Sequence, residues 1–325
     1  MPNFICLAFF ALNLLYNISM QRDVIVLGGN GFLGSNLCNK LDEQGISAYV
    51  LDKALKCDLS TSSGQQMFRD IVYDCNQEVD VVMMAAQLGA KLFDETPIEP
   101  FNENLAIDMN TIDSIKKMHN EHGIKFHVTY YSTSEVYGNM LDYSRHDIYV
   151  DPKHSRSLYA QEKLIIETLL NYMKSCNEIE SLRIFRPFNV SGKNQKRGVI
   201  YEMVKSAVEK KCIFYPLNQS REITFVQDAT DIAFKHIVDR TDCTIDLTSR
   251  FHISLKDLAY CVKRAIEKTY PDCLGSIETV EMPKNDSYIK HRGTAPLIND
   301  ADQLNRFIEK MIEMNIVKDI SKGFL

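Results

Sequence analysis

Short apolar runs alternate along the chain with longer stretches whose apolar residues recur at helical spacing. Continuous apolar runs bounded by glycine or polar residues are typical of parallel strands buried on both faces. Strands that alternate with amphipathic helices predict an α/β fold with a doubly wound parallel sheet. The predicted strands are Asp23–Leu27, Ala48–Leu51, Val79–Met84, Phe126–Tyr131, Leu182–Phe185 and Thr244–Leu247. The predicted helices are Phe32–Glu43, Ser60–Asn76, Leu105–His122, Ser157–Met173, Val199–Lys210, Phe225–Asp239 and Leu255–Lys268.

The alternation changes after Pro187, where a polar, loop-like stretch begins. The chain has no low-complexity segment or long linker, so its two parts are expected to pack closely. We predict a larger domain over residues 20–188, with a later strand near 244–247, and a smaller C-terminal α/β domain over residues 189–325.

The first 19 residues are interpreted as an extra segment. Their apolar run Phe4–Tyr16 is about 13 residues long and broken by Asn13, whereas a transmembrane helix needs about 20 apolar residues. No basic residue precedes Arg22, so the basic region of a secretory signal is missing. We expect the native start at Met20, and we expect a chain without residues 1–19 to fold and to be active. A weak membrane anchor and a packed extra segment are the alternatives.

Charge and cysteine content exclude several classes of protein. The 325 residues include 37 basic and 43 acidic side chains, for a net charge of −6. This balance lacks the basic surface that nucleic acids require, so no nucleic-acid partner is expected. Nine scattered cysteines without a CxxC pair argue against a disulfide framework and against a bound metal, and favour a cytoplasmic location. The acidic run Asp94–Glu103 is interpreted as a solvated loop.

A glycine-rich turn follows the first predicted strand and opens the first predicted helix. Glycine permits the tight turn and lets the backbone approach a pyrophosphate, while the N–H groups and dipole of the helix attract the phosphates. The strand–turn–helix context indicates a Rossmann-like dinucleotide site, and a tight turn with incidental glycines is the alternative. The positions predicted to contact the cofactor are Gly28, Gly31, Phe32, Leu33 and Gly34.

A carboxylate, Asp52, ends the second predicted strand. It can accept hydrogen bonds from ribose hydroxyls and would repel a 2′-phosphate, which favours NAD over NADP. The adjacent Lys53 weakens that preference. Asp58 and Leu59 are placed to flank the adenine, and the alternative for Asp58 is a cap at the start of the next helix.

Tyr159 and Lys163 are four residues apart on a predicted helix, so they share one face. An ammonium near a phenol stabilises the phenolate, which is expected to lower the pKa of Tyr159 toward a useful range for proton transfer. An exposed helix pair is the alternative interpretation.

The segment Tyr131–Gly138 lies where a predicted strand ends. Open α/β sheets bind ligands at the carboxyl ends of their strands. Thr133, Ser134 and Glu135 are therefore candidates for a catalytic site, and a turn-forming role for Ser132 and Ser134 is the alternative.

These motifs resemble the extended short-chain dehydrogenase/reductase superfamily, and within it the NAD-dependent nucleotide-sugar epimerase/dehydratase group. The resemblance covers about residues 20–310 and rests on segments in the family's order. The segments are VIVLGGNGFLG, VLD, CDL, VVMMAAQLGA, STSEVYG, YAQEK, RIFRPFNVSG and REITFVQD. Leu27 stands where Thr is usual, Gly192-Lys193 where Gly-Pro is usual, and Pro216–Ser220 replaces a glycine-rich stretch.

The resemblance implies a role for each matching position. Tyr159 would accept the proton of the sugar O4 hydroxyl while hydride leaves C4 for NAD. Lys163 would hold the nicotinamide ribose and lower the pKa of Tyr159, and Thr133 would bond the same sugar hydroxyl. Ala85 and Ala86 would border NAD.

The C-terminal part would bind a nucleotide-diphosphate sugar, and residues 20–188 would bind NAD. Asn189 would approach the diphosphate, and Arg221 and Arg292 would pair with phosphate or ribose, since a guanidinium binds phosphate bidentately. A surface ion pair is the alternative for both arginines. The family commonly forms homodimers through two helices, here Leu105–His122 and Ser157–Met173. No membrane partner is indicated.

The sequence leaves the net reaction open. Glu135 could remove a C5 proton as in 4,6-dehydratases, and the same Thr-Ser-Glu triplet resembles that of UDP-glucuronate decarboxylases. Arg156 or Arg292 could receive a substrate carboxylate, or could equally face the diphosphate. A 4-epimerase needs no added acid or base and is the alternative. A non-catalytic NAD-binding sensor is an alternative of another class, disfavoured because Tyr159 and Lys163 are both present.

Overall fold

The computed structural model describes six stretches of the chain: residues 22–87, 96–137, 157–216, 219–269, 277–282 and 301–313. The segment 1–19, the expected start at Met20, and the candidates Arg156 and Arg292 lie outside the described residues.

The larger lobe is built on a sheet of six strands. They are β1 (Asp23–Leu27), β2 (Ala48–Leu51), β3 (Glu78–Met83), β4 (Lys125–Tyr131), β5 (Ser181–Pro187) and β9 (Cys243–Leu247). The order is β2-β1-β3-β4-β5-β9, and every neighbouring pair is parallel. The carboxyl ends of all six strands therefore lie along one edge, and the order switches direction between β1 and β3. The predicted α/β fold is confirmed.

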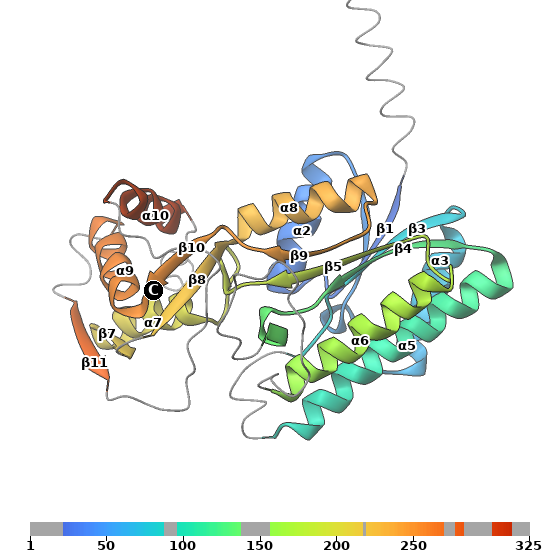
Figure 1. Ribbon diagram of the computed structural model, residues 1–325, viewed down its shortest axis with the longest axis horizontal. Helices are drawn as coiled ribbons and strands as arrows, with labels where there is room; N and C mark the ends of the chain where they lie inside the picture. Colours follow the sequence, from blue (N-terminus) through green and yellow to red (C-terminus); the bar gives the residue numbers. More distant parts are fainter. Residues whose placement is uncertain are drawn as a thin grey trace, which may run out of the picture.

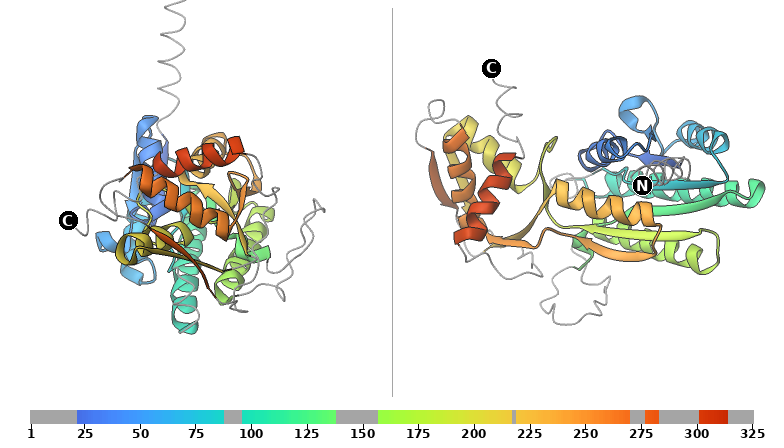
Figure 2. Two further views of the ribbon diagram at one scale, coloured as in Figure 1. Left: turned by 90° about the vertical axis from the view of Figure 1, so that its left-hand side faces the viewer. Right: turned by 90° about the horizontal axis from the view of Figure 1, so that it is seen from above.

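Helices cover both faces of this sheet (Figures 1 and 2). Successive side chains of β1 point to opposite faces of the sheet, as they do in any β-strand. Ile25 and Leu27 belong to one buried cluster, and Val24 and Val26 belong to the other. The helices of the first face are α3 (Ser62–Asp74), α5 (Ile98–His122) and α6 (Leu158–Ser175), and those of the second are α2 (Phe32–Glu43) and α8 (Val226–Asp239).

The smaller lobe has an apolar core of its own. Three rings at its centre, Phe225, Phe251 and Phe307, have centroids 5.2–5.6 Å apart. One sheet has the order β10-β8-β6, and a second pairs β11 with β7. The elements are β6 (Val190–Ser191), α7 (Val199–Lys210), β7 (Cys212–Pro216), β8 (Ser220–Phe225), β10 (Phe251–Ser254), α9 (Leu255–Thr269), β11 (Glu278–Met282) and α10 (Ala301–Glu313).

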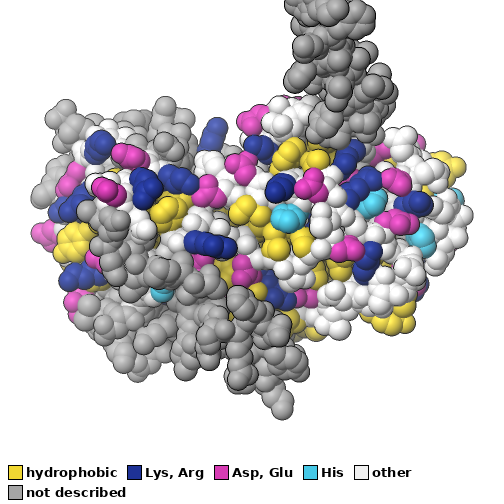
Figure 3. Space-filling model, turned by 45° about the horizontal axis from the view of Figure 1, so that its top comes forward, with side chains coloured by type: hydrophobic (Ala, Val, Ile, Leu, Met, Phe, Trp, Pro, Cys, Tyr) yellow, Lys and Arg dark blue, Asp and Glu magenta, His cyan; other side chains and the backbone are white. Residues whose placement is uncertain are grey.

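The surface carries mixed charge. On the face drawn in Figure 3, Lys and Arg side chains are interspersed with Asp and Glu side chains. Among the described residues, no helix combines the length and the apolar character needed to cross a membrane.

Helix α5 corrects one sequence prediction. The run Asp94–Glu103 is predicted as a loop, but Ile98–Glu103 form the first turns of the helix. Pro97 precedes the helix with φ −68°, a value suited to helix entry. Glu99 lies in the first turn, where its negative charge interacts favourably with the helix dipole. The acidic run was therefore a helix start and not a solvated loop over these residues.

A buried polar cluster joins three strands near their amino ends. Arg183 of β5 is fully buried and donates to Thr129 Oγ1 at 2.7 Å, and its guanidinium lies 3.8 Å from the Asp80 carboxylate of β3. Arg240, which follows α8, donates to the other Asp80 oxygen at 2.9 and 3.2 Å and to Glu78 at 2.6 Å. Removing one member of a buried pair typically costs about 3–5 kcal/mol, so this cluster fixes α8 to the sheet.

His127 of β4 borders the same cluster. Its Nδ1 lies 2.8 Å from Ser181 Oγ, and its Nε2 lies 3.8 Å from Glu78. Burial, and then the charges of Arg240 and Arg183, lower the pKa of His127 below its usual 6.5, while Asp80 and Glu78 oppose the shift.

We predict that the free energy of unfolding decreases as the pH drops below about 6.5. In this range His127 binds a proton more readily in the unfolded chain than in the folded protein, because its pKa is lower in the folded protein. His127→Gln should flatten this part of the pH dependence. The measurement is the free energy of urea unfolding between about pH 7.5 and pH 5.5. The exposed His122→Gln is the matched control, and an equal flattening in that variant would contradict the assignment.

Candidate active site

The glycine turn lies at the point where the strand order reverses. Gly28 has φ +84°, and a Cβ on it would lie 2.8 Å from backbone atoms of Ala85, in the loop that follows β3. A Cβ on Gly34 would lie 2.3 Å from the Gly28 carbonyl oxygen, so α2 packs directly on the turn. Gly31 caps α2 without a side chain, which leaves the first N–H groups of the helix accessible. This cradle fits a dinucleotide pyrophosphate. The predicted cofactor contacts of Phe32, Leu33 and Ala86 stay predictions.

Asp52 stands at the end of β2 and is held by two backbone donors. Asn30 N–H donates to one carboxylate oxygen at 3.0 Å, and Ala54 N–H donates to the other at 2.9 Å. Lys53 turns away to Asp58 and Glu103, at 3.1 and 3.0 Å. Because Lys53 is engaged by two carboxylates, it is poorly placed to receive a 2′-phosphate.

Asp58 and Leu59 divide their roles. Hydrogen bonds from Ser60 lower the pKa of Asp58 although burial opposes the shift, and the nearby helix α3 is capped by Thr61 instead. The Leu59 side chain belongs to the apolar core at 3% exposure. Its predicted place beside the adenine stays a prediction.

Tyr159 and Lys163 lie on one face of α6, near the helix start. Ser157 caps the helix by accepting from Ala160 N–H. Lys163 Nζ lies 5.8 Å from the centre of the Tyr159 ring and 4.8 Å from the centre of the Tyr130 ring. Tyr159 is only partly buried, whereas Lys163 is 2% exposed.

Two carboxylates hold the Lys163 ammonium. Asp108 of α5 lies 3.4 Å from Nζ and also accepts from Tyr130 OH at 2.8 Å. Glu162 lies 3.4 Å from Nζ and accepts from Asn104 Nδ2 at 2.9 Å. The sequence did not identify these two acids as partners of the lysine.

The expected lowering of the Tyr159 pKa is wrong for this structure. Burial raises the pKa of Tyr159, and the charges of Glu135, Glu162 and Asp108 raise it further. Lys163 does act in the predicted direction, but it does not outweigh the burial. The pKa of Lys163 itself is raised, since the two carboxylates more than offset the effect of burial. Tyr159 is thus protonated at rest and needs a proton acceptor before it can act as a base.

The carboxyl end of β4 brings the hydroxyl and acid candidates beside Tyr159. Thr133 is buried, and its hydroxyl accepts from Glu135 N–H at 3.2 Å. Ser134 begins the short helix η2 (Ser134–Tyr137) and is also buried. Glu135 accepts from Ser157 Oγ at 2.9 Å, which ties this strand end to the start of α6.

Arg197 is a site residue that the sequence did not single out. It lies in the loop before α7, exposed at its surface but near enough to Tyr159 for the two charges to interact. The loop is fixed by Gln195, whose amide donates to the Arg197 carbonyl oxygen at 2.6 Å. Partial burial lowers the pKa of Arg197, and Tyr159 acts in the opposite direction.

The substrate candidates of the smaller lobe are held by local contacts. Asn189 has φ +37° and donates from its amide to the Glu222 carbonyl oxygen at 3.0 Å. Arg221 lies on β8 and donates to the Ser220 carbonyl oxygen at 2.9 Å and to Gln219 Oε1 at 3.3 Å. Their predicted contacts with a nucleotide stay predictions.

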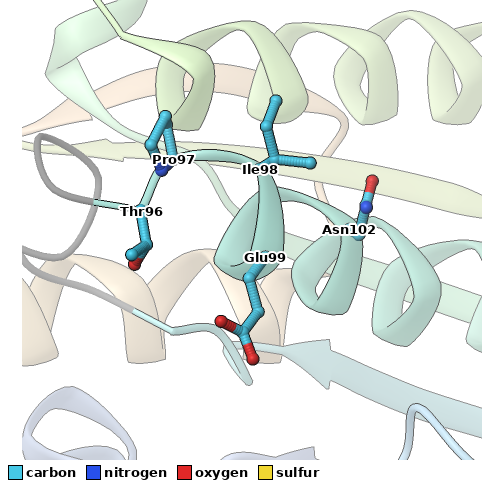
Figure 4. A pocket seen from close by; sticks show the side chains of 5 residues that line it. All are labelled: Thr96, Pro97, Ile98, Glu99 and Asn102. Atoms are coloured by element: carbon cyan, nitrogen blue, oxygen red, sulfur yellow. The ribbon is translucent and has the colours of Figure 1, made fainter.

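A separate depression of about 450 Å³ opens at the start of α5 (Figure 4). Its lining consists of Thr96, Pro97, Ile98, Glu99 and Asn102. None of the predicted site residues borders it. Among the described residues, no group of His, Cys, Asp and Glu has the grouping needed to hold a metal ion.

Comparison with known proteins gives one family and two sets of similar proteins. The model of the NAD dependent epimerase/dehydratase family matches residues 24–242. UDP-glucuronic acid decarboxylases 1 and 6 of Arabidopsis thaliana are 24% and 27% identical to this chain, over 87% and 81% of its length. The alignments cover 65% and 78% of those two relatives, and 57% of UDP-glucuronic acid decarboxylase 2 of the same plant.

Solved structures show the same fold. The UDP-glucose 4-epimerase of Thermus thermophilus, crystallised with NAD, is 18% identical, with a TM-score of 0.71 over 93% of this chain and all of that one. An NAD-dependent NDP-hexosamine 5,6-dehydratase is 18% identical, with a TM-score of 0.70 over 93% of this chain and 98% of that one.

We predict that Asp52→Asn weakens NAD binding and narrows the preference for NAD over NADP. A hydrogen bond to a charged group contributes about 1.5–3 kcal/mol, so the Kd for NAD should rise roughly 10- to 100-fold. The amide keeps an acceptor for Ala54 N–H but loses the one for Asn30 N–H, so urea unfolding of the variant is measured alongside. Calorimetric titration with both cofactors measures the effect, and an unchanged ratio of the two Kd values would remove Asp52 from cofactor selection.

Proposed function

The chain belongs to the NAD dependent epimerase/dehydratase family, and we propose that it oxidises a UDP-linked uronic acid at C4 and then releases carbon dioxide from the 4-keto sugar. NAD follows as the cofactor from family membership, and the glycine cradle and Asp52 fit it. The match to UDP-glucuronic acid decarboxylases supports the choice of substrate.

One observation carries the proposal. The Lys163 ammonium lies 5.8 Å from the centre of the Tyr159 ring, and both Glu135, after β4, and Arg197, before α7, lie near enough to interact electrostatically with Tyr159. A phenol can remove a hydroxyl proton once its own proton has passed to a neighbouring group. A guanidinium beside that phenol suits a substrate that carries its own carboxylate near the reacting carbon.

The chain's own residues would act in order. Tyr159 accepts the O4 proton, with Thr133 bonding the same hydroxyl, and NAD when bound accepts the hydride from C4. The ketone at C4 is β to the carboxylate on C5, so the carbon–carbon bond can break and its electrons pass to the ketone. Arg197 would orient the carboxylate, and Glu135 would return a proton to C5. Return of the hydride to C4 and of a proton to O4 would then restore the alcohol and the oxidised cofactor.

Dehydration is the second candidate, because Glu135 lies beside Tyr159 and could also remove a C5 proton. A neutral hexose would then lose water from C5 and C6. Epimerisation at C4 needs neither Glu135 nor Arg197, and a non-catalytic sensor needs neither Tyr159 nor Lys163.

We further propose a homodimer formed through α5 and α6, which pack against each other in the larger lobe. Their outer surfaces carry several large exposed apolar side chains, as an interface requires. These are Ile98, Met109, Ile165 and Tyr172.

The test is incubation with NAD and a panel of UDP-glucuronate, UDP-glucose, dTDP-glucose and GDP-mannose, followed by product mass spectrometry. We predict that UDP-glucuronate is the one substrate of this panel that is converted, and that its product has lost carbon dioxide. Tyr159→Phe should lower kcat by about 10²- to 10⁴-fold with the fold and NAD binding intact, because the proton acceptor is gone. Loss of water or an epimeric product would select one of the alternatives, and no turnover of any sugar with intact NAD binding would favour the sensor.

A second prediction concerns Glu135→Gln. The amide still accepts from Ser157 Oγ but cannot transfer a proton at C5. Oxidation at C4 should therefore continue, while the rate of final product formation should fall by about 10²-fold or more. Reduced cofactor should then accumulate in a single turnover, measured by its absorbance. Product formation at the wild-type rate would exclude Glu135 as the second acid or base.

A further inference from the structure

The buried group around Lys163 has more negative than positive charge. Asp108, Glu162 and Lys163 are each 2% exposed or less. The single ammonium lies 3.4 Å from each of the two carboxylates. With both acids ionised, the group would carry a net charge of −1 away from water, which is costly unless a proton or a cation compensates it.

The two acids differ in how well they are satisfied. Asp108 Oδ2 receives both Tyr130 OH, at 2.8 Å, and Lys163 Nζ. Glu162 receives Asn104 at one oxygen, while its Oε1 has the ammonium nearby but no hydrogen bond within the described residues. Burial raises the pKa of both acids, but the Glu162 carboxylate has fewer hydrogen-bond donors, so a proton is more readily placed on Glu162.

The charged groups facing Glu162 come from three elements. Lys163 and Tyr159 lie on its own helix, Asp108 comes from α5, and Tyr130 comes from β4. Burial, and then the opposing charges of Lys163 and Asp108, leave the pKa of Glu162 raised to about 7. Its protonation state can thus change under ordinary conditions.

We propose that Glu162, acting through Lys163, holds the proton released when the sugar alcohol is oxidised and gives it back when the ketone is reduced. The inference rests on the proposed function, because it assumes that NAD binds beside Tyr159. The oxidised nicotinamide brings one positive charge, which compensates an ionised Glu162. The reduced ring brings none, so the carboxylate then needs a proton.

The step balances. The Lys163 ammonium first gives one of its protons to the Glu162 carboxylate, and the neutral amine then takes the phenol proton of Tyr159. The phenolate then takes the O4 proton while the C4–H bond breaks and its electron pair leaves as hydride. Alcohol, oxidised cofactor and Glu162 carboxylate become ketone, reduced cofactor and Glu162 carboxylic acid. This also supplies the proton acceptor that the raised pKa of Tyr159 requires.

The experiment counts protons on cofactor binding, without substrate. Titration calorimetry near neutral pH, in buffers of different ionisation enthalpy, gives the protons exchanged per site. Wild-type protein should release up to about one proton on binding NAD and none on binding NADH. Glu162→Gln should abolish this difference, and Glu162→Asp should restore part of it.

Glu167→Gln is the matched control. Glu167 is also buried on α6, but it is paired bidentately with Arg186 at 2.6 and 3.1 Å. Its charge is balanced by that guanidinium and not by the cofactor, so its variant should keep the wild-type difference. An equal proton count for NAD and NADH in wild-type protein, or a difference that survives Glu162→Gln, would overturn the inference.

Infrared titration of the cofactor-free protein provides a second readout. A carboxyl band that titrates near neutral pH and is missing from Glu162→Gln supports the inference, and its absence from wild-type protein overturns it. Failure of the proposed function looks different. A protein that shows this proton difference but converts no nucleotide sugar would support the inference and contradict the proposed function. A protein that converts a nucleotide sugar without the proton difference would support the proposed function and contradict the inference.

Discussion

The burial of one ammonium group governs the arrangement of the site. Lys163 is almost fully enclosed, so it must be paired, and its partners come from α5 and from its own helix. These contacts fix the distance between α5 and α6 and hold Tyr159 at the carboxyl edge of the sheet. They also bring two carboxylates near Tyr159, whose charges oppose the effect of the ammonium on the Tyr159 pKa. The structure thereby couples the position of the phenol to the ionisation of two acids.

Parallel strand pairing explains why distant residues meet. Because β1, β3 and β4 point the same way, the Gly28 turn, Ala85 and Thr133 all emerge at one edge. The opposite edge carries the Asp80–Arg183–Arg240 cluster instead. The candidate site therefore lies at the carboxyl ends of the strands, and the buried ion pairs lie toward the opposite ends.

Local sequence patterns predict most helices and strands of the larger lobe, but few of the contacts between residues that are distant in the sequence. Helix α2 matches its predicted bounds, because its apolar spacing and glycine entry are local signals. Strand β8 was missed because Arg221 and Glu222 look exposed in sequence, yet both are buried. The tyrosine–lysine pair could be predicted from its spacing, but not the partnership of Lys163 with Asp108, 55 residues earlier in the chain. A pKa set by burial depends on such partners, which explains why its predicted direction for Tyr159 failed.

Strand β9 has a consequence for synthesis. It completes the edge of the large sheet beside β5, but the chain first builds β6, α7, β7 and β8 of the smaller lobe. On the ribosome, the edge of β5 therefore stays open until residues 243–247 have emerged. Co-translational folding of the two lobes must accordingly overlap in time, and neither can finish before translation has passed through most of the other.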